Sequence, residues 1–222
     1  MKGKKVDAAF AVGYVMFFSL VAYLVYSGMF DKFNATVPFI AGFVQFAIFS
    51  TTGELLSGRL LYGNWTISNV TFYKALLWGT SGLAVTIMFN VVSNGVVAVM
   101  ENGLIPFGGN AFAVALVTSC LINLFFAPIH AAAIRIFSNY IEERFQNNHR
   151  MSAYEATMSV EWGEFVDFTF FKTVPFFWIP INTLGFLLPV NLRVAFAALL
   201  SFVFGMLMTL LKLRERRRGE KK

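Results

Sequence analysis

The amino-acid sequence has 222 residues, of which 57% are hydrophobic and 14% are charged, and its formal net charge is +6. Soluble domains usually have about 25% charged residues, so this composition excludes an ordinary soluble domain. Apolar stretches that are long enough to cross a bilayer as helices recur along the chain. They are continuous rather than alternating, which excludes outer-membrane strands. We therefore predict an all-α fold, a polytopic transmembrane helix bundle that forms one integral membrane domain over residues 1–222.

Six transmembrane spans are predicted, and in chain order they cover about 8–30, 37–57, 72–99, 110–137, 167–188 and 192–212. If both termini are cytoplasmic, only Lys32 and Arg193 among the Lys and Arg residues fall on the outer side. Cytoplasmic loops are enriched in these residues, so the distribution predicts an N-in, C-in topology. Residues 1–35 are then an additional N-terminal helix, 36–212 the main bundle and 213–222 a basic cytoplasmic tail.

The basic end of the chain, KLRERRRGEKK, has two interpretations. Nucleic-acid binding is one of them. The other is a topology determinant that lies beside anionic lipid headgroups, and it agrees with the apolar spans. We therefore predict the lipid bilayer as a partner and no nucleic-acid partner.

The long polar connection 138–166 has the pattern of a short amphipathic helix. Ser152 precedes Glu155 by three residues, which is the capping-box spacing that starts a helix. Apolar residues then recur every three or four positions and share one face; they are Met151, Tyr154, Met158, Trp162 and Phe165. We expect this helix to lie at the cytoplasmic membrane surface or against the bundle. Recognition of a partner protein is the alternative.

Polar side chains recur within the predicted spans, where they should face the bundle interior or a watery cavity. In the third and fourth spans their spacings of four and seven residues place each set on one helical face. The candidate residues are Gln45 and Glu54 in the second span, Thr86, Asn90 and Asn94 in the third, Ser119, Asn123 and His130 in the fourth, and Asn182 in the fifth.

Two interpretations of these polar residues remain open. In the functional one they line a polar path or a substrate cavity, where His130 can titrate near neutral pH. In the structural one they form hydrogen bonds between helices, each contributing about 0.6 kcal/mol. Glu54 lies near the cytoplasmic end of its span, so it can pair with Arg59 or Lys74 instead of binding an ion.

Three prolines are candidate helix kinks: Pro128, Pro175 and Pro180. Proline removes one helix hydrogen bond, and Pro128 thereby frees the carbonyl of Leu124. Because prolines are commoner in membrane helices than in soluble ones, these kinks do not by themselves indicate gating.

Catalytic motifs are scarce. The sequence has two His residues, no HExxH spacing and no GxSxG nucleophile elbow. Its single cysteine, Cys120, rules out a disulfide framework. Glu142 and Glu143 in IEERF resemble the paired carboxylates of some intramembrane proteases, but no second histidine motif accompanies them. We therefore predict that the protein is not an enzyme and that it needs no metal and no cofactor.

The order of several motifs resembles the Mpv-seventeen and peroxisomal membrane protein family of small helical-bundle membrane proteins. TTGELLSGRL is similar to its glycine-acid motif, through Gly53 and Glu54. LINLFFAP is similar to a stretch that ends in alanine-proline, and FFWIPINTLGFLLPVNLRV is similar to a tryptophan-proline signature. The sequence departs from the family at Ile122 and Asn123, where an acid and a glutamine are usual. The resemblance covers about 36–212 and implies a poorly selective channel or a protein that maintains solute balance.

We predict a membrane channel or transporter for small polar solutes, lined by the third and fourth spans. The alternative function is a non-transporting membrane scaffold that binds partner proteins through 138–166. A homo-oligomer is compatible with either function. The short loops and the absence of a targeting signal favour a prokaryotic plasma membrane, and an organelle membrane is the alternative.

Overall fold

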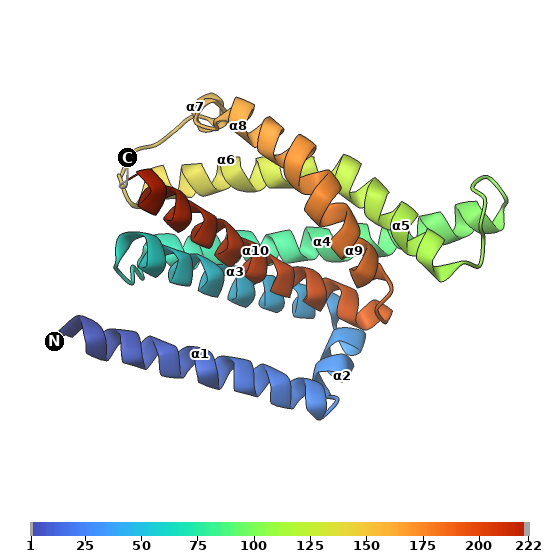
Figure 1. Cartoon of the computed structure of the whole chain (residues 1–222), viewed down its shortest axis with the longest axis horizontal. Coiled ribbons are helices and arrows are strands. Elements are labelled where there is room, and N and C mark those ends of the chain that lie inside the picture. Colours follow the sequence, from blue (N-terminus) through green and yellow to red (C-terminus); the bar gives the residue numbers. More distant parts are fainter. Residues whose placement is uncertain (1, 220–222) are drawn as a thin grey trace. The chain divides into compact units, whose positions relative to one another are not determined.

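The computed structural model of the protein describes residues 2–219. Every regular element within that range is a helix, so the prediction of an all-α fold is confirmed for the described part of the chain. The helices belong to two compact units, the first ending at Pro38 and the second beginning at Phe39 (Figure 1). The last residues of the predicted basic tail, 220–222, lie outside the described range.

The first unit contains α1 (Lys2–Tyr26) and α2 (Met29–Thr36). Gly28 forms the turn between them with a φ of 71°, a left-handed conformation that glycine adopts without steric cost. From Val6 onward α1 is long and apolar enough to cross a membrane. This helix occupies the segment predicted as an additional N-terminal helix.

The second unit contains the remaining helices, of which two are π-helices labelled η. In chain order they are α3 (Pro38–Tyr62), α4 (Asn69–Glu101), α5 (Ala111–Leu121), η1 (Ile122–Phe126), α6 (Ala127–Phe145), α7 (Ala153–Met158), α8 (Trp162–Val166), η2 (Asp167–Trp178), α9 (Ile179–Phe186) and α10 (Val190–Gly219).

Local sequence explains several helix starts. Pro38 suits the first position of α3, where its missing N–H is not needed. Ser68 and Thr71 form a capping box at the start of α4. At the start of α5 the backbone N–H of Ala113 donates to the side-chain oxygen of Asn110 over 3.0 Å.

Five helical segments are long and apolar enough to cross a membrane: Val6–Tyr26, Pro38–Tyr62, Asn69–Glu101, Ala111–Phe145 and Val190–Arg214. They correspond to five of the six predicted spans and indicate an integral membrane protein. The predicted span 167–188 is largely helical, because α8, η2 and α9 follow one another without a break. It is not among the five segments, so the sixth span and the N-in, C-in topology stay predictions.

Two glycines bring α3 and α4 into close contact. A Cβ atom added to Gly82 would lie 2.2 Å from the carbonyl oxygen of Gly42, and one added to Gly42 would lie 2.3 Å from Thr86 Oγ1. The Thr86 hydroxyl is buried beside them and donates to the Gly82 carbonyl over 2.8 Å. Small residues of this kind let membrane helices pack backbone to backbone.

The helices of the second unit have their ends on two opposite sides (Figure 1). The C-terminal ends of α3, α6 and α10 lie on the same side as α7, which we call the α7 end. The loop 102–110 between α4 and α5 lies on the opposite side, which we call the loop end. Because α4 runs between the two ends, the position of a residue on α4 shows how far a site lies from the α7 end.

The predicted amphipathic helix in 138–166 is divided into α7 and α8. The capping box is confirmed, since Glu155 N–H donates to Ser152 Oγ over 3.2 Å and Ser152 N–H donates to Glu155 Oε2 over 2.6 Å. The helix then ends near Ser159, whose side chain donates to the carbonyl of Ala156, a local bond that competes with helix continuation. Tyr154 and Met158 of the expected apolar face are exposed. The segment therefore contains two short helices, and an amphipathic helix at the cytoplasmic membrane surface stays a prediction.

Candidate functional site

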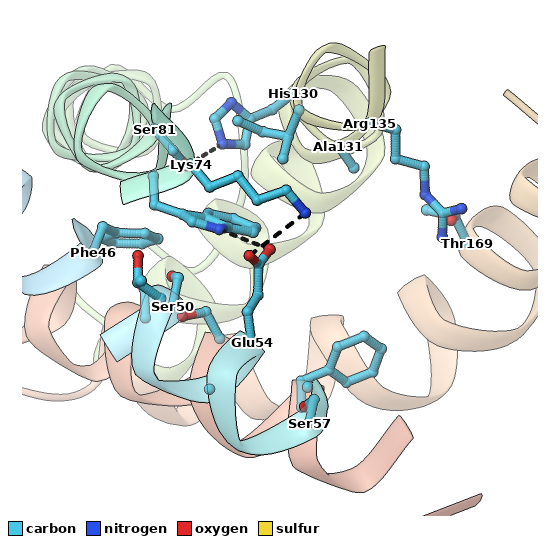
Figure 2. A pocket seen from close by; sticks show the side chains of 18 of the residues that line it. Phe46, Ser50, Glu54, Ser57, Lys74, Ser81, His130, Ala131, Arg135 and Thr169 are labelled. Atoms are coloured by element: carbon cyan, nitrogen blue, oxygen red, sulfur yellow. Dashed lines mark hydrogen bonds and ion pairs between the residues drawn. The ribbon is translucent and has the colours of Figure 1, made fainter. Parts of the chain in front are cut away.

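A cavity of about 900 Å³ lies within the second unit. Residues of α3, α4, η1, α6, α8, η2, α9 and α10 form its wall, part of which is shown in Figure 2. Small-molecule pockets usually have volumes of roughly 300–1,000 Å³, so this cavity has room for a small organic ligand. It is the candidate functional site.

The wall of the cavity changes in polarity along its length. Its charged residues lie on the helix halves that run toward the α7 end: Glu54, Lys74, Arg135, Glu142 and Lys212. Its inner end is formed mainly by apolar, aromatic and amide side chains, among them Phe89, Ile122, Asn123, Trp178 and Asn182. On α4 the rise per residue separates Lys74 from Phe89 by roughly 22 Å. The cavity therefore has a charged end and a largely apolar inner end.

Lys74 bridges two carboxylates from other helices at the charged end. Its Nζ lies 3.7 Å from Glu54 Oε2 on α3, and it also forms an ion pair with Glu142 on α6. Trp78 Nε1 donates to Glu54 Oε1 over 3.0 Å. The side chain of Lys74 is 16% exposed, whereas those of Glu54 and Glu142 are 37% and 45% exposed. The expected pairing of Glu54 with Lys74 is confirmed, and Glu142 is a further partner.

His130 lines the cavity between the charged end and the inner end. Its Nε2 lies 2.7 Å from Ser81 Oγ, and either atom can be the donor (Figure 2). The imidazole also stacks on the ring of Phe126, with the ring centroids 4.9 Å apart. These contacts join α6 to α4 and fix the orientation of the imidazole at the cavity wall.

Pro128 is accommodated by the π-helix η1 rather than by a break. In η1 the backbone N–H of Ala127 donates to the carbonyl of Ile122, five residues earlier. Proline has no N–H to donate, and π-bulges of this kind occur frequently at functional sites. The widened turn contains Asn123, which is buried in the second unit.

Asn123 belongs to a polar chain that crosses to α9. Asn182 Nδ2 donates to Asn123 Oδ1 over 3.2 Å. Asn123 Nδ2 donates to the carbonyl of Ser119 over 2.8 Å, and the Ser119 hydroxyl donates to the carbonyl of Ile179 over 2.8 Å. This chain connects α5 and η1 with the start of α9 at the inner end of the cavity.

A second cavity of about 280 Å³ lies toward the loop end and is lined by residues that include Val97, Glu101, Val114, Phe186 and Arg193. Phe89 lines the first cavity and Phe186 the second. Their rings contact each other, with centroids 4.8 Å apart. The Phe89–Phe186 pair is therefore part of the layer between the two cavities.

The structure places the candidate residues in different surroundings. Glu54, Asn123, His130 and Asn182 line the large cavity, whereas Gln45, Thr86 and Ser119 are buried outside its wall. Asn90 and Asn94 are exposed and also lie outside the wall. Asn90 Nδ2 donates to the carbonyl of Thr86 over 2.8 Å. Of the candidate kinks, Pro128 follows η1, Pro175 lies inside η2 and Pro180 lies in the first turn of α9.

The residues of α4 that line the cavity are not the predicted ones, Thr86, Asn90 and Asn94. A stripe of them consists of Lys74, Trp78, Ser81, Val85 and Phe89, at helical spacings of four and three. The stripe mixes charged, aromatic and apolar residues, so a search for amides passes over it. The signal that does point to it is the lysine on a membrane helix, because intramembrane charges mark functional sites by default.

Among the described residues, no group of three or more His, Cys, Asp and Glu side chains is placed to hold a metal ion. No known protein-family model, no curated protein and no solved structure matches this chain. The resemblance to the Mpv-seventeen family is therefore based on the sequence motifs alone.

Proposed function

We propose that this integral membrane protein is a channel or transporter for small solutes, and that solutes pass through its second unit. The observation that carries the proposal is the pair of cavities, one reaching the charged end and the other lying toward the loop end. Phe89 in the wall of the first cavity and Phe186 in the wall of the second are in contact. Such an arrangement suits a path that is closed at one constriction.

In this proposal the layer between the cavities acts as a gate that is held by two kinds of weak contact. Aromatic pairs contribute about 0.5–1.5 kcal/mol beyond the burial of their area, and one hydrogen bond contributes a net 0.5–1.5 kcal/mol. Loss of the Phe186–Phe89 contact and of the Asn182–Asn123 hydrogen bond therefore contributes a few kcal/mol to the cost of opening. Phe186 and Asn182 both lie on α9, which also packs against α5, η2 and α10, so opening of the layer requires this helix to shift against those neighbours.

The polar chain at the inner end supports the same proposal. Asn123 and Asn182 line the inner end of the large cavity, where their amides can replace part of the hydration of a polar solute. The resemblance to the Mpv-seventeen family adds to the proposal, since its members are associated with solute passage. We place the protein in a prokaryotic plasma membrane, with an organelle membrane as the alternative.

Solute flux into liposomes that contain the purified full-length protein tests this proposal. We expect measurable flux of a small polar solute such as glycerol or urea, and faster flux for Phe89→Ala and Phe186→Ala. Phe112→Ala is the matched control, because Phe112 is an exposed phenylalanine of α5 that lines neither cavity. Absence of flux in both the wild type and the two gate variants would overturn the proposal.

A pair of asparagine variants refines the test. Asn123→Leu should lower the flux, because it removes an amide from the inner end of the cavity. Asn90→Leu should leave the flux per folded protein unchanged, because Asn90 is exposed outside the cavity wall. Equal loss of flux in both variants would place the path somewhere other than the cavity.

A scaffold function is the second candidate, and the exposure of Tyr154 and Met158 on α7 favours it. A partner protein that docks on this surface should be lost from cross-linked complexes when both residues are changed to Ser. If complexes are lost while the wild-type protein shows no flux for any solute, the scaffold replaces the transporter as the better proposal.

A further inference from the structure

We infer that the large cavity binds a small organic anion with a carboxylate head and an aromatic body, and that Arg135 binds the head. This inference rests on the proposed function, because it names the class of solute that occupies the cavity. It is based on the unused hydrogen-bonding capacity of Arg135, the pairing of the cavity carboxylates and the aromatic inner wall.

Arg135 is an exposed residue of the cavity wall, and none of the described acidic residues pairs with it. Its guanidinium carbon lies 5.2 Å from the centroid of the Phe165 ring, and Phe165 is buried. Among the described residues, none forms an ion pair or a hydrogen bond with this guanidinium, although it carries five N–H donors. The cation–π contact orients the side chain without neutralising its charge.

The guanidinium is placed to receive a ligand from the cavity. Arg135 on α6 and Thr169 on η2 both line the wall, and both are labelled in Figure 2. A planar guanidinium binds a carboxylate through two parallel N–H···O bonds, and a neighbouring hydroxyl can donate a third. Lys212 on α10 adds a second positive charge to the wall.

A cationic ligand fits this cavity less well. Glu54 and Glu142 are both paired with Lys74, and Glu54 also accepts the Trp78 indole N–H. A cation would have to displace Lys74, which would leave a largely covered ammonium group without its partners. An anion that binds Arg135 displaces no protein group.

Aromatic side chains on the inner wall provide a place for the body of the ligand. Trp178 and Phe204 line the cavity, and their ring centroids are 4.8 Å apart. Phe126, stacked on His130, lines it from η1. Offset or edge contacts with such rings favour an aromatic ligand over an aliphatic one of equal size. The volume of about 900 Å³ accommodates a ring with a short side chain.

Three probes with the same phenylpropyl body and different heads test the inference: phenylpropionate, phenylpropylamine and phenylpropanol. Binding to the purified full chain in lipid nanodiscs is measured by isothermal titration calorimetry. We expect phenylpropionate to bind about tenfold more tightly than phenylpropanol, since a hydrogen bond to a charged group contributes more than a neutral one. Equal or tighter binding of phenylpropylamine, or no binding of any probe, would overturn the inference.

Variants of two arginines on α6 identify the group that binds the head. Arg135→Gln should weaken phenylpropionate binding about tenfold and leave phenylpropanol binding unchanged. Arg144→Gln should change neither, because Arg144 lies outside the cavity wall and bonds to Asn148 over 3.2 Å. Unchanged phenylpropionate binding in Arg135→Gln would overturn the role of Arg135. If that variant does not fold, the relative affinities of the wild type for the three probes still test whether the cavity prefers an anionic head.

The binding test and the flux test fail separately. Binding of phenylpropionate without flux of any solute would keep the anion site and overturn the transporter. Flux of glycerol or urea without binding of phenylpropionate would keep the transporter and overturn the anion site.

Discussion

Asn182 Nδ2 donates a hydrogen bond to Asn123 Oδ1 over 3.2 Å, which ties α9 to the π-helix η1 within the second unit. Both side chains are buried, yet both line the large cavity. The contact therefore joins two helices and also places two amides in the cavity wall. The two interpretations of the membrane asparagines, as hydrogen bonds between helices and as the lining of a polar path, therefore both remain open for Asn123 and Asn182.

A double-mutant cycle on Asn123 and Asn182 measures the structural part. Each change to Ala should lower the free energy of unfolding by about 1 kcal/mol, because it removes one partner of a buried hydrogen bond. The coupling energy should be about 0.6 kcal/mol, the average for such bonds between membrane helices. Unfolding in mixed detergent micelles, followed by circular dichroism, gives these values. A coupling energy of zero would show that the bond does not stabilise the fold.

Gly82→Ala should destabilise the second unit by about 1–3 kcal/mol, since the added methyl group overpacks the α3–α4 contact. Its Cβ would lie 2.2 Å from the Gly42 carbonyl oxygen. Gly95→Ala on the same helix is the control, because nothing lies within 4 Å of its added Cβ. It should be neutral, or stabilising by up to about 1 kcal/mol through helix propensity. Thermal unfolding of both variants decides, and equal stability would contradict the close packing.

Lys74→Met should lower stability by about 1–2 kcal/mol, because it leaves Glu54 and Glu142 without their shared cation. Solvent screening limits the loss, since both carboxylates are more than one third exposed. Lys172→Met is the control: Lys172 forms an exposed ion pair with Asp167, and its loss should cost less than about 1 kcal/mol. Further substitution of Glu54→Gln and Glu142→Gln should restore much of the stability lost in Lys74→Met. A Lys74→Met protein as stable as Lys172→Met would show that the bridge contributes nothing.

The stability of α7 should depend on pH through Glu155. Hydrogen bonds from the backbone and side chain of Ser152 hold the pKa of this carboxyl below its ordinary value of 4.5. A lowered folded-state pKa means that the stabilisation is complete above pH 4.5 and is lost as the pH falls through the lowered value. Hydrogen exchange of the α7 amides, corrected for intrinsic rates, should therefore speed up in that window. Glu155→Gln should show no such change, and an identical pH profile in both proteins would contradict the capping-box origin.

Local and compositional features of the fold could be predicted from the sequence. Uninterrupted apolar runs predict membrane helices because lipid offers no partner for backbone N–H and C=O groups. The capping box of Ser152 and Glu155 involves residues three positions apart, so its geometry is local. A basic partner for Glu54 could be predicted as either Arg59 or Lys74, since all three lie near the same predicted ends of the second and third spans, and the structure selects Lys74.

The candidate site could be predicted only in part. Helical spacing places Asn123 and His130 on one face, but it does not say which of several polar faces of α4 meets them. Asn90 and Asn94 share a helical face with Thr86, but Thr86 is buried at the Gly42–Gly82 contact and the two asparagines are exposed outside the cavity wall. Arg135 could not be selected from the sequence, because only the three-dimensional structure shows that no acidic side chain pairs with it.

The sequence by itself determined that this protein is an all-helical membrane protein with charged and amide residues inside its helices, because composition and helical period act over short distances. Only the tertiary structure decided which of those residues share a cavity. The rotation of each helix is set by side chains that pack from distant segments, such as Gly42 against Gly82, Phe89 against Phe186 and Lys74 between Glu54 and Glu142. No single segment contains the information that fixes those rotations.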